Sequence, residues 1–198
     1  MKSPYFLYER YPALVCCKDD IEKAAQALNE TFKNGGVIYC CGNGGSAADC
    51  EHIVGELMKG FLKKRTLSDE EKMRLSAYGE KGDYLACNLQ GAIPAVSLVN
   101  SVGLGTAFAN DVAPELVFAQ QIYGLGKAHD ALIAISTSGN SKNVIYAILS
   151  AKVIGQIYDT LGLYFMLFVN SCPFYVSEVI ILLIQMILKV SGCCILLV

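Results

Sequence analysis

The sequence predicts an α/β fold, in which a parallel sheet carries helices on both faces and forms a three-layer sandwich. Three short apolar runs alternate with stretches of helical periodicity, and two of the runs end in a turn rich in glycine and serine. Strands that alternate with helices predict a parallel sheet. Ligands of such sheets bind at the carboxyl ends of the strands, so we expect both turns at the ligand-binding edge.

The first strand is expected between two helices. Asp20–Phe32 has helical periodicity, which a pair of glycines ends. Val37–Cys41 is a short apolar run typical of a buried strand, and the turn Gly42–Ser46 follows it directly. Helical periodicity returns over Ala47–Phe61.

The middle of the chain carries a charged excursion and the second strand. Lys63–Asp83 lacks strong apolar periodicity, but Ser68–Leu75 opens with a capping box and predicts a short helix. The excursion is longer than a tight connection needs, and it has the length to alter the mouth of a ligand pocket. We expect the second strand at Ala95–Val99, a loop or helix over Asn100–Asn110, and a helix over Pro114–Tyr123.

Ala131–Ile135 is the clearest strand, and the turn Ser136–Ser141 and a helix over Lys142–Val153 follow it. A helix N-terminus presents unpaired N–H groups and partial positive charge, which suits an anion such as a phosphate group. Glycine admits close approach, and hydroxyls add donors. Neither turn is a P-loop or G-x-G-x-x-G, which disfavours a nucleotide. Either turn alone is equally explained as a cap and tight connection, whereas two at one edge favour a ligand.

His52 and Glu56 stand four residues apart on the helix after the first turn, so they share a face. A glutamate beside a phosphosugar can remove a proton alpha to a carbonyl, and the pair can also share a metal such as zinc. The alternative is an exposed helical pair with Glu51 as a solvated neighbour. Asn110 and Asp111 follow the second strand, where Asp111 is suited to hold a sugar hydroxyl or to cap the next helix.

Composition excludes several classes of protein. A length of 198 residues indicates one domain with a sizeable core, and a net charge of -2 indicates no strong attraction to nucleic acid. The opening residues lack the apolar core of a secretory signal, and no cysteine pair has CxxC spacing. We therefore expect a cytoplasmic protein with reduced, mostly buried thiols, a disulfide framework being the alternative.

Charge density falls abruptly near the end of the chain. Of 18 acidic and 16 basic residues, three lie from Gln156 onward, namely Asp159, Glu178 and Lys189. We divide the chain into a ligand-binding domain over residues 1–155 and an anomalous apolar tail over residues 156–198.

Two long motifs resemble those of the phosphoheptose isomerases, which belong to the sugar isomerase (SIS) class. The first is Cys41–Asp49 followed by His52–Leu57, and the second is Ile135–Ser141 followed by Asn143 and Val144. The resemblance covers residues 5–155. It implies a flavodoxin-like sheet and cytoplasmic homotetramers with active sites between subunits. The implied reaction is isomerisation of sedoheptulose 7-phosphate to D-glycero-D-manno-heptose 7-phosphate.

The resemblance also implies a role for each matching residue. Glu56 would be the base that forms the enediol, and His52 and Glu56 would be two ligands of zinc. The sugar phosphate would be bound by Asn43, Gly44, Gly45, Ser46, Glu56, Asn110, Asp111, Ser136, Thr137, Ser138 and Ser141.

The tail departs from the family pattern. The family ends with a helix that carries a glutamine and, eight residues on, a histidine, which complete the zinc site and supply the general acid. Here Gln185 is followed eight residues on by Cys193, a spacing that we interpret as chance. The family's next strand is not recognisable after Gly155, and the usual C-terminal strand and helix are taken to be replaced. The active site is incomplete as written, which predicts phosphosugar binding with weak or absent turnover.

Three interpretations of the tail remain open. A frameshift or assembly error is favoured because the break is abrupt and the motifs before it are intact. A membrane anchor is the second, although the apolar runs are short for a span and Pro173 interrupts them. A divergent core ending is the third. The alternative function is a non-catalytic SIS protein that binds phosphosugar or associates with a replication initiator.

Overall fold

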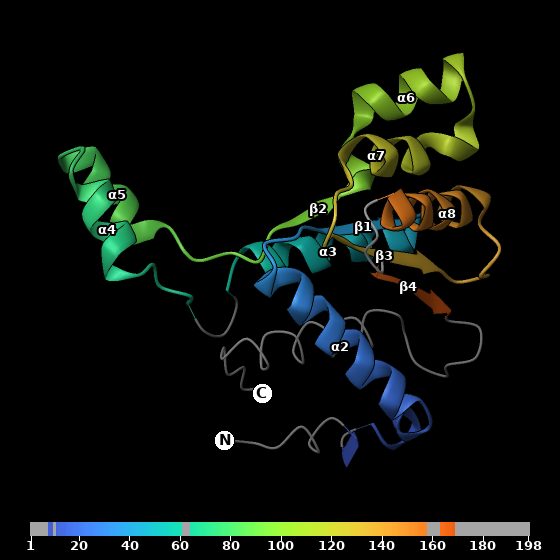
Figure 1. The fold of residues 1–198 in the computed structure, drawn as a ribbon, viewed down its shortest axis with the longest axis horizontal. Coiled ribbons are helices and arrows are strands. Elements are labelled where there is room, and N and C mark those ends of the chain that lie inside the picture. The colour runs from blue at the N-terminus through green and yellow to red at the C-terminus, as the bar shows by residue number, and fades with distance from the viewer. Residues whose placement is uncertain (1–7, 10, 61–63, 158–162, 169–198) are drawn as a thin grey trace.

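A four-stranded parallel sheet forms the centre of the protein. The structure is a computed structural model that describes residues 8–9, 11–60, 64–157 and 163–168 (Figure 1). The strand order is β2-β1-β3-β4, with all neighbours parallel, which confirms the predicted parallel sheet. The strands are β1 (Ile38–Gly42), β2 (Ala95–Ser97), β3 (Ala131–Ser136) and β4 (Leu163–Phe168).

Helices cover both faces of the sheet, as the sequence predicts. The helices α2 (Lys18–Lys33) and α3 (Gly45–Met58) share one apolar cluster with the sheet, and α7 (Val117–Leu125) and α8 (Lys142–Ile157) share the other. Shorter elements connect these layers, namely η1 (Pro12–Cys17), α4 (Asp69–Ser76), α5 (Glu80–Asn88), η2 (Leu98–Asn100), α6 (Val102–Asp111) and η3 (Pro114–Leu116).

Strand β1 shows how the sequence builds both layers. Ile38 and Cys40 belong to the cluster beneath α2 and α3, whereas Tyr39 and Cys41 belong to the cluster beneath α7 and α8. Successive side chains of a strand point to opposite faces, so a continuous apolar run suits a strand that is covered on both sides. All five residues of β1 are buried, as this pattern predicts.

Strand β4 corrects one expectation. The sequence predicts no further strand after Gly155, but Leu163–Phe168 pairs with β3 in parallel, from Ala131 beside Leu163 to Ser136 beside Phe168. This strand could not be recognised from the sequence because its residues are all apolar. Such a run has no periodicity that distinguishes a buried strand from a buried helix. The remaining expectations for residues 169–198, including Gln185 and Cys193, lie outside the described residues.

The charged excursion forms two antiparallel helices, which we call the α4–α5 hairpin (residues 68–89). Ser68 and Glu71 form the predicted capping box at the start of α4, whereas α5 was not predicted. The hairpin lies between the end of α3 and the start of β2, and therefore beyond the amino ends of the strands (Figure 1). The expectation that it alters the pocket mouth is wrong within one chain, because both turns lie at the opposite edge.

The cysteine side chains that the structure describes differ sharply in environment. Cys40, Cys41 and Cys50 are buried, whereas Cys16 and Cys87 are exposed. Burial raises the pKa of Cys50 to about 12, with the nearby Asp49 carboxylate adding to the rise. Burial also raises the pKa of Cys41. A thiol with a raised pKa stays protonated near neutral pH and is a poor nucleophile.

We therefore expect a thiol reagent at pH 8 to modify the exposed Cys16 and Cys87 in the native protein. The three buried thiols should react only after denaturant is added. Peptide mass spectrometry after timed labelling checks this prediction. Rapid native labelling of Cys50 would contradict the burial and the raised pKa.

None of the helices in the described parts of the chain combines the length and the apolarity that a membrane span requires.

Candidate functional site

Both glycine- and serine-rich turns lie side by side at the carboxyl edge of the sheet. β1 and β3 are central neighbours, and their pairing places Gly42 beside Ile135 at the ends of the two strands. From β1 the chain continues to β2 on one side, and from β3 it continues to β4 on the other. In doubly wound sheets, the crevice at such a reversal of strand order is where ligands bind.

Two asparagines join the turns across this crevice. The Asn43 Nδ2 donates to the Asn143 Oδ1 at 2.9 Å, and the Asn143 Nδ2 donates back to the Asn43 Oδ1 at 2.8 Å. The Asn143 Oδ1 also accepts the Val144 N–H at 3.0 Å. Asn43 was predicted as a site residue, but Asn143 received no role because only the strand order reveals that the turns are adjacent.

The first turn leads directly into α3. Gly44 has φ +54°, a conformation that favours glycine, and it is the N-cap of the helix without any side-chain cap. The Ala47 N–H already donates to the Gly44 carbonyl oxygen at 3.1 Å. The N–H groups of Gly45 and Ser46 at the start of the helix are therefore the ones that suit an anion. Ser46, the second residue of the helix, is buried.

Gly42 is tightly enclosed by the same turn. A Cβ at this position would lie 2.8 Å from the Ser46 Cβ and 2.9 Å from the Ser46 carbonyl oxygen. Part of this crowding comes from the backbone of α3, which a side-chain rotation cannot relieve.

Gly42→Ala should therefore lower the free energy of unfolding by about 1–3 kcal/mol, the usual cost of overpacking. The matched control is Gly55→Ala in the last turn of α3, where an added Cβ meets nothing within 4 Å. Alanine is a better helix former than glycine, so the control should be stabilised by about 0.5–1 kcal/mol. Urea unfolding followed by circular dichroism compares the two; equal effects would contradict the crowding at Gly42.

The second turn is held by hydrogen bonds among its own residues. The Ser136 Oγ donates to the Ser141 Oγ at 3.1 Å, and the Ser138 Oγ accepts the Asn140 N–H at 3.2 Å. Gly139 has φ +68°, which permits the sharp reversal before α8. Ser136 is buried at the end of β3, whereas Thr137 and Ser138 are exposed beside the helix N-terminus.

The predicted pair on α3 lies farther along the helix than the turns. His52 is exposed and Glu56 is partly buried. Glu56 follows Gly45 by eleven residues, which corresponds to about 16 Å along the helix axis at ~1.5 Å per residue. A ligand that contacts both the second turn and Glu56 must therefore be extended, or must lie between two copies of the chain.

Two further acidic residues, Asp49 and Glu51, lie on this helix. Burial raises the pKa of Asp49, while the nearby His52 lowers it. The Asn100 Nδ2 donates to the Glu51 Oε2 and ties η2, after β2, to α3. Glu51 is exposed, as expected of a solvated neighbour, but it also has this partner, which the sequence did not predict. Its partner is 49 residues away in the sequence, so no local pattern could reveal the contact.

Asn110 and Asp111 form a pair of their own at the end of α6. The Asn110 Nδ2 donates to the Asp111 Oδ1 at 2.8 Å, and both side chains are exposed. Within the described residues, no hydrogen bond connects the two side chains to either turn. The alternative that Asp111 caps the next helix is wrong, because Asp111 ends α6 and the caps of η3 and α7 are Ala113 and Leu116.

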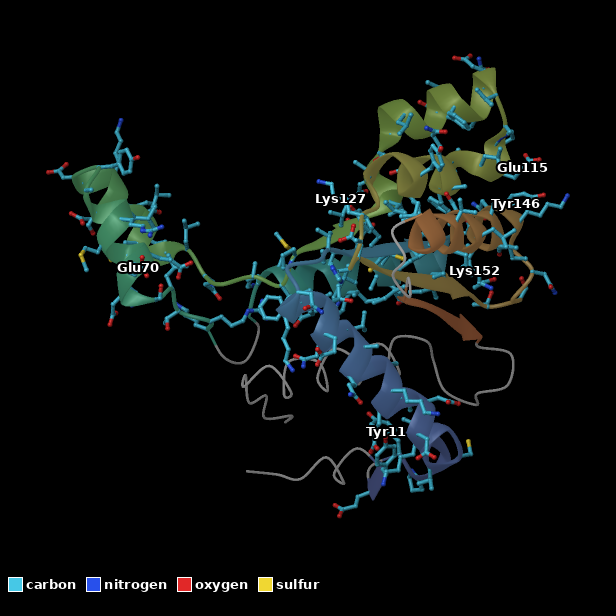
Figure 2. All side chains as sticks on the ribbon, in the orientation of Figure 1. Tyr11, Glu70, Glu115, Lys127, Tyr146 and Lys152 are labelled. Atoms are coloured by element: carbon cyan, nitrogen blue, oxygen red, sulfur yellow. The ribbon has the colours of Figure 1, made fainter. Side chains whose placement is uncertain are left out.

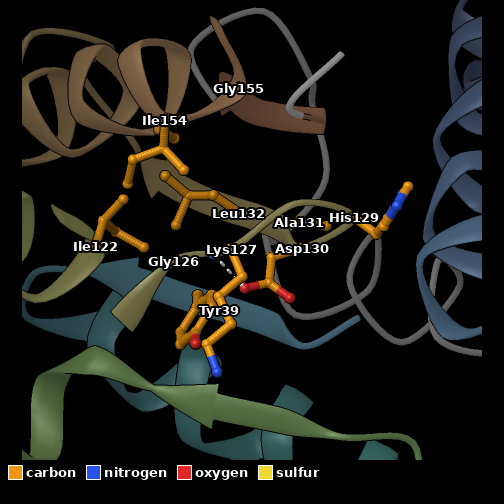
Figure 3. Close-up of a pocket in the computed structure, with 11 residues that line it drawn as sticks. Tyr39, Ile122, Gly126, Lys127, His129, Asp130, Ala131, Leu132, Ile154 and Gly155 are labelled. Carbon is orange, nitrogen blue, oxygen red and sulfur yellow. Dashed lines mark hydrogen bonds between the residues drawn. The ribbon is translucent and has the colours of Figure 1, made fainter. Parts of the chain in front are cut away.

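The described residues contain no group of three histidine, cysteine, aspartate or glutamate side chains placed to hold a metal ion. A cavity of about 30 Å³ lies at the opposite, amino-terminal side of β3, between Tyr39, Ile122 and Ile154 (Figure 3). Its volume suits about one water molecule. Asp130 at its edge accepts the N–H groups of Val37 and Lys127, both at 2.8 Å, so this side of the sheet is structural.

Comparisons with known proteins agree with this arrangement. An SIS domain model matches residues 15–85. The phosphoheptose isomerase of Campylobacter concisus is 36% identical over 135 residues, 68% of this chain and 58% of that relative. The phosphoheptose isomerase of Helicobacter pylori is 37% identical over 144 residues, 73% of this chain and 62% of that relative. The chain therefore spans less than two thirds of the length of these curated relatives.

Solved structures extend the similarity to nearly the whole chain. A phosphoheptose isomerase from Neisseria gonorrhoeae has a TM-score of 0.53 and 25% identity, covering 93% of this chain and 94% of that chain. A phosphoheptose isomerase from Francisella tularensis has a TM-score of 0.58 at 21% identity, which supports the fold alone.

Proposed function

The chain belongs to the phosphoheptose isomerase family of SIS domains over the stretch that it shares with these relatives, and from this premise we propose that it binds and isomerises sedoheptulose 7-phosphate. The observation that carries the proposal is the meeting of the two turns at the crevice between β1 and β3, joined by Asn43 and Asn143. The relatives give no support to the alternative of a non-catalytic regulatory protein.

The phosphate group would be bound by the second turn. Ser136, Thr137, Ser138 and Ser141 supply hydroxyl groups at the N-terminus of α8, where the helix dipole favours an anion. The sugar would extend along the first turn past Asn43–Ser46 towards Asn110 and Asp111. Binding of the remote phosphate would hold the reacting carbons in place.

Glu56 would carry the proton between the two reacting carbons. In the ketose-to-aldose direction, its carboxylate takes a proton from C1, and the electron pair of the C–H bond forms the C1=C2 bond of the enediol. The carboxylic acid then returns the proton to C2, while the C1 oxygen becomes the aldehyde. The oxygen atoms must also exchange a proton, which the family assigns to a histidine in the C-terminal helix. The sequence has two histidines, His52 and His129, so we propose that turnover is slow.

The zinc ion that the resemblance implies would be held by His52 and Glu56. His52 and Glu56 supply two donors, whereas catalytic zinc sites use three protein ligands. The described residues contain no third donor beside this pair, so they do not fit a catalytic zinc ion. We also propose the cytoplasmic homotetramer that the resemblance implies, with sites between subunits, which is compatible with the distance of Glu56 from the turns.

The proposed activity is tested by incubating the full chain with sedoheptulose 7-phosphate and following the anomeric aldose signals by NMR. We expect slow formation of the heptose phosphate at a rate proportional to protein concentration. Saturable binding without any aldose would reject the isomerase proposal while retaining a phosphosugar site. Absence of both would reject the site.

A further inference from the structure

We propose that Asn143 is a positioning residue, which acts through Asn43 to hold the first turn in place against the second. Asn143 is the second residue of α8, a helix whose later residues Tyr146 and Lys152 are labelled in Figure 2. It lies outside the predicted set of site residues. Its role rests on the sugar-phosphate site proposed above and adds to that site a residue that does not itself contact the ligand.

The sheet does not continue between the two turns. The pairing of β1 with β3 ends at Gly42 beside Ile135, directly before the chain enters each turn. Among the residues that the structure describes, the two bonds between Asn43 and Asn143 are the only side-chain hydrogen bonds that join the first turn to the second turn or to the start of α8. This pair therefore fixes the two turns relative to each other at the edge where the pairing of the strands ends.

Asn143 is itself held in one orientation. Its Oδ1 accepts both the Asn43 Nδ2 and the Val144 N–H, and its Nδ2 donates to the Asn43 Oδ1. If the oxygen and nitrogen of this amide changed places, the Val144 N–H would face a donor and lose its bond. Both polar atoms of the Asn143 side chain are thus engaged within the protein, which suits a positioning residue better than one that binds the sugar.

The pair also determines what the Asn43 amide can offer to a ligand. An asparagine amide has two N–H donors and one carbonyl oxygen. In Asn43, one N–H and the oxygen are bound to Asn143, and the side chain is exposed. Asn43 therefore keeps one N–H with which it can donate to a sugar hydroxyl oxygen.

A ligand that contacts both turns should depend on the pair, whereas an anion confined to the second turn should not. The phosphate group of the proposed ligand is bound by hydroxyl groups of the second turn, and its sugar lies along the first turn. Without Asn143 the two turns would keep their own hydrogen bonds, but the first turn could shift relative to the second. A sugar hydroxyl would then meet Asn43 at a poorer distance and angle, which weakens a hydrogen bond steeply.

The experiment compares sedoheptulose 7-phosphate with inorganic phosphate by phosphorus NMR titration of the full chain. Asn143→Ala should weaken binding of the phosphosugar at least about tenfold and binding of inorganic phosphate less than about twofold, because the lost hydrogen bonds orient only the sugar-binding turn. Asn43→Ala breaks the same pair from its exposed side and should show the same selective loss. The proposal therefore remains testable if one of the two variants does not fold.

The matched control is Asn88→Ala. Asn88 is an exposed asparagine of the α4–α5 hairpin whose Nδ2 donates to the Tyr84 carbonyl oxygen at 2.8 Å. Its removal deletes one side-chain hydrogen bond away from the crevice, so both affinities should equal those of the wild type. Circular dichroism and thermal unfolding establish that each variant is folded.

The double variant, Asn43→Ala with Asn143→Ala, tests whether Asn143 acts through Asn43. If it does, the second substitution should add less than about twofold to the effect of the first, because the two residues share one interaction. Losses that multiply would overturn the proposal. Equal losses for both ligands in Asn143→Ala would indicate damage to the second turn alone and would overturn it too.

The wild type separates this role from the proposed function. Phosphosugar binding by the wild type that is unchanged in Asn143→Ala would reject the role of Asn143 and leave the site intact. Failure of the wild type to bind the phosphosugar would reject the site, and the role of Asn143 with it.

Discussion

Glu56→Gln should abolish proton exchange at the reacting carbon of bound sedoheptulose 7-phosphate. The amide cannot accept the proton that the carboxylate removes, and positioned general bases contribute rate factors of about 10²–10⁴. Exchange in D₂O, followed by NMR as loss of the C1 proton signals, isolates this step. It does not require complete turnover, so it is measurable even if the general acid is missing.

The control for this substitution is Glu51→Gln on the same helix. Glu51 accepts a hydrogen bond from Asn100, and a glutamine side-chain oxygen can still accept it. We expect both the exchange rate and the sugar-phosphate affinity of Glu51→Gln to be close to those of the wild type. Exchange that persists in Glu56→Gln would show that another group is the base.

Ser138→Asp should weaken binding of the phosphosugar at least about 100-fold, because like charges brought together cost several kcal/mol. Ser138 is exposed in the second turn, so the new carboxylate can be solvated in the free protein and the fold should be retained. Calorimetric titration measures the affinity.

Two comparisons make this result specific. Ser138→Ala removes one neutral hydrogen bond and should cost about tenfold in affinity or less. Thermal unfolding of the free proteins should be similar for all three. A Ser138→Asp protein that bound the phosphosugar as tightly as the wild type would place the phosphate elsewhere.

The parts of the fold that follow local rules could be predicted from the sequence. The apolar run of β1, the clear strand Ala131–Ile135 and the Ser68–Glu71 capping box all have short-range signals. Strand β4 has no such signal. The residues on both sides of it are also largely apolar, so no change of pattern marks where the strand begins and ends. The helix α5 was missed because it buries only Gly82 and Ala86 and so lacks an apolar stripe.

In the site, too, features within one turn could be predicted from the sequence, whereas contacts between distant residues could not. The turns themselves could be identified from glycine, serine and the strands before them. Their connection through Asn43 and Asn143, which are 100 residues apart, depends on β1 and β3 being neighbours in the sheet. The Glu51–Asn100 contact likewise depends on the position of η2 beside α3. Single-sequence patterns contain no information on such pairings.

The most direct test of the central claim is calorimetric titration of the wild-type chain with sedoheptulose 7-phosphate and, separately, with unphosphorylated sedoheptulose. If the two turns form a phosphosugar site, the phosphorylated sugar should bind at one site per chain, and the unphosphorylated sugar should bind at least about 100-fold more weakly, since charge-assisted hydrogen bonds to the phosphate are lost. Equal affinity for both sugars, or no saturable binding of either, would contradict a phosphate-binding role for the crevice between β1 and β3.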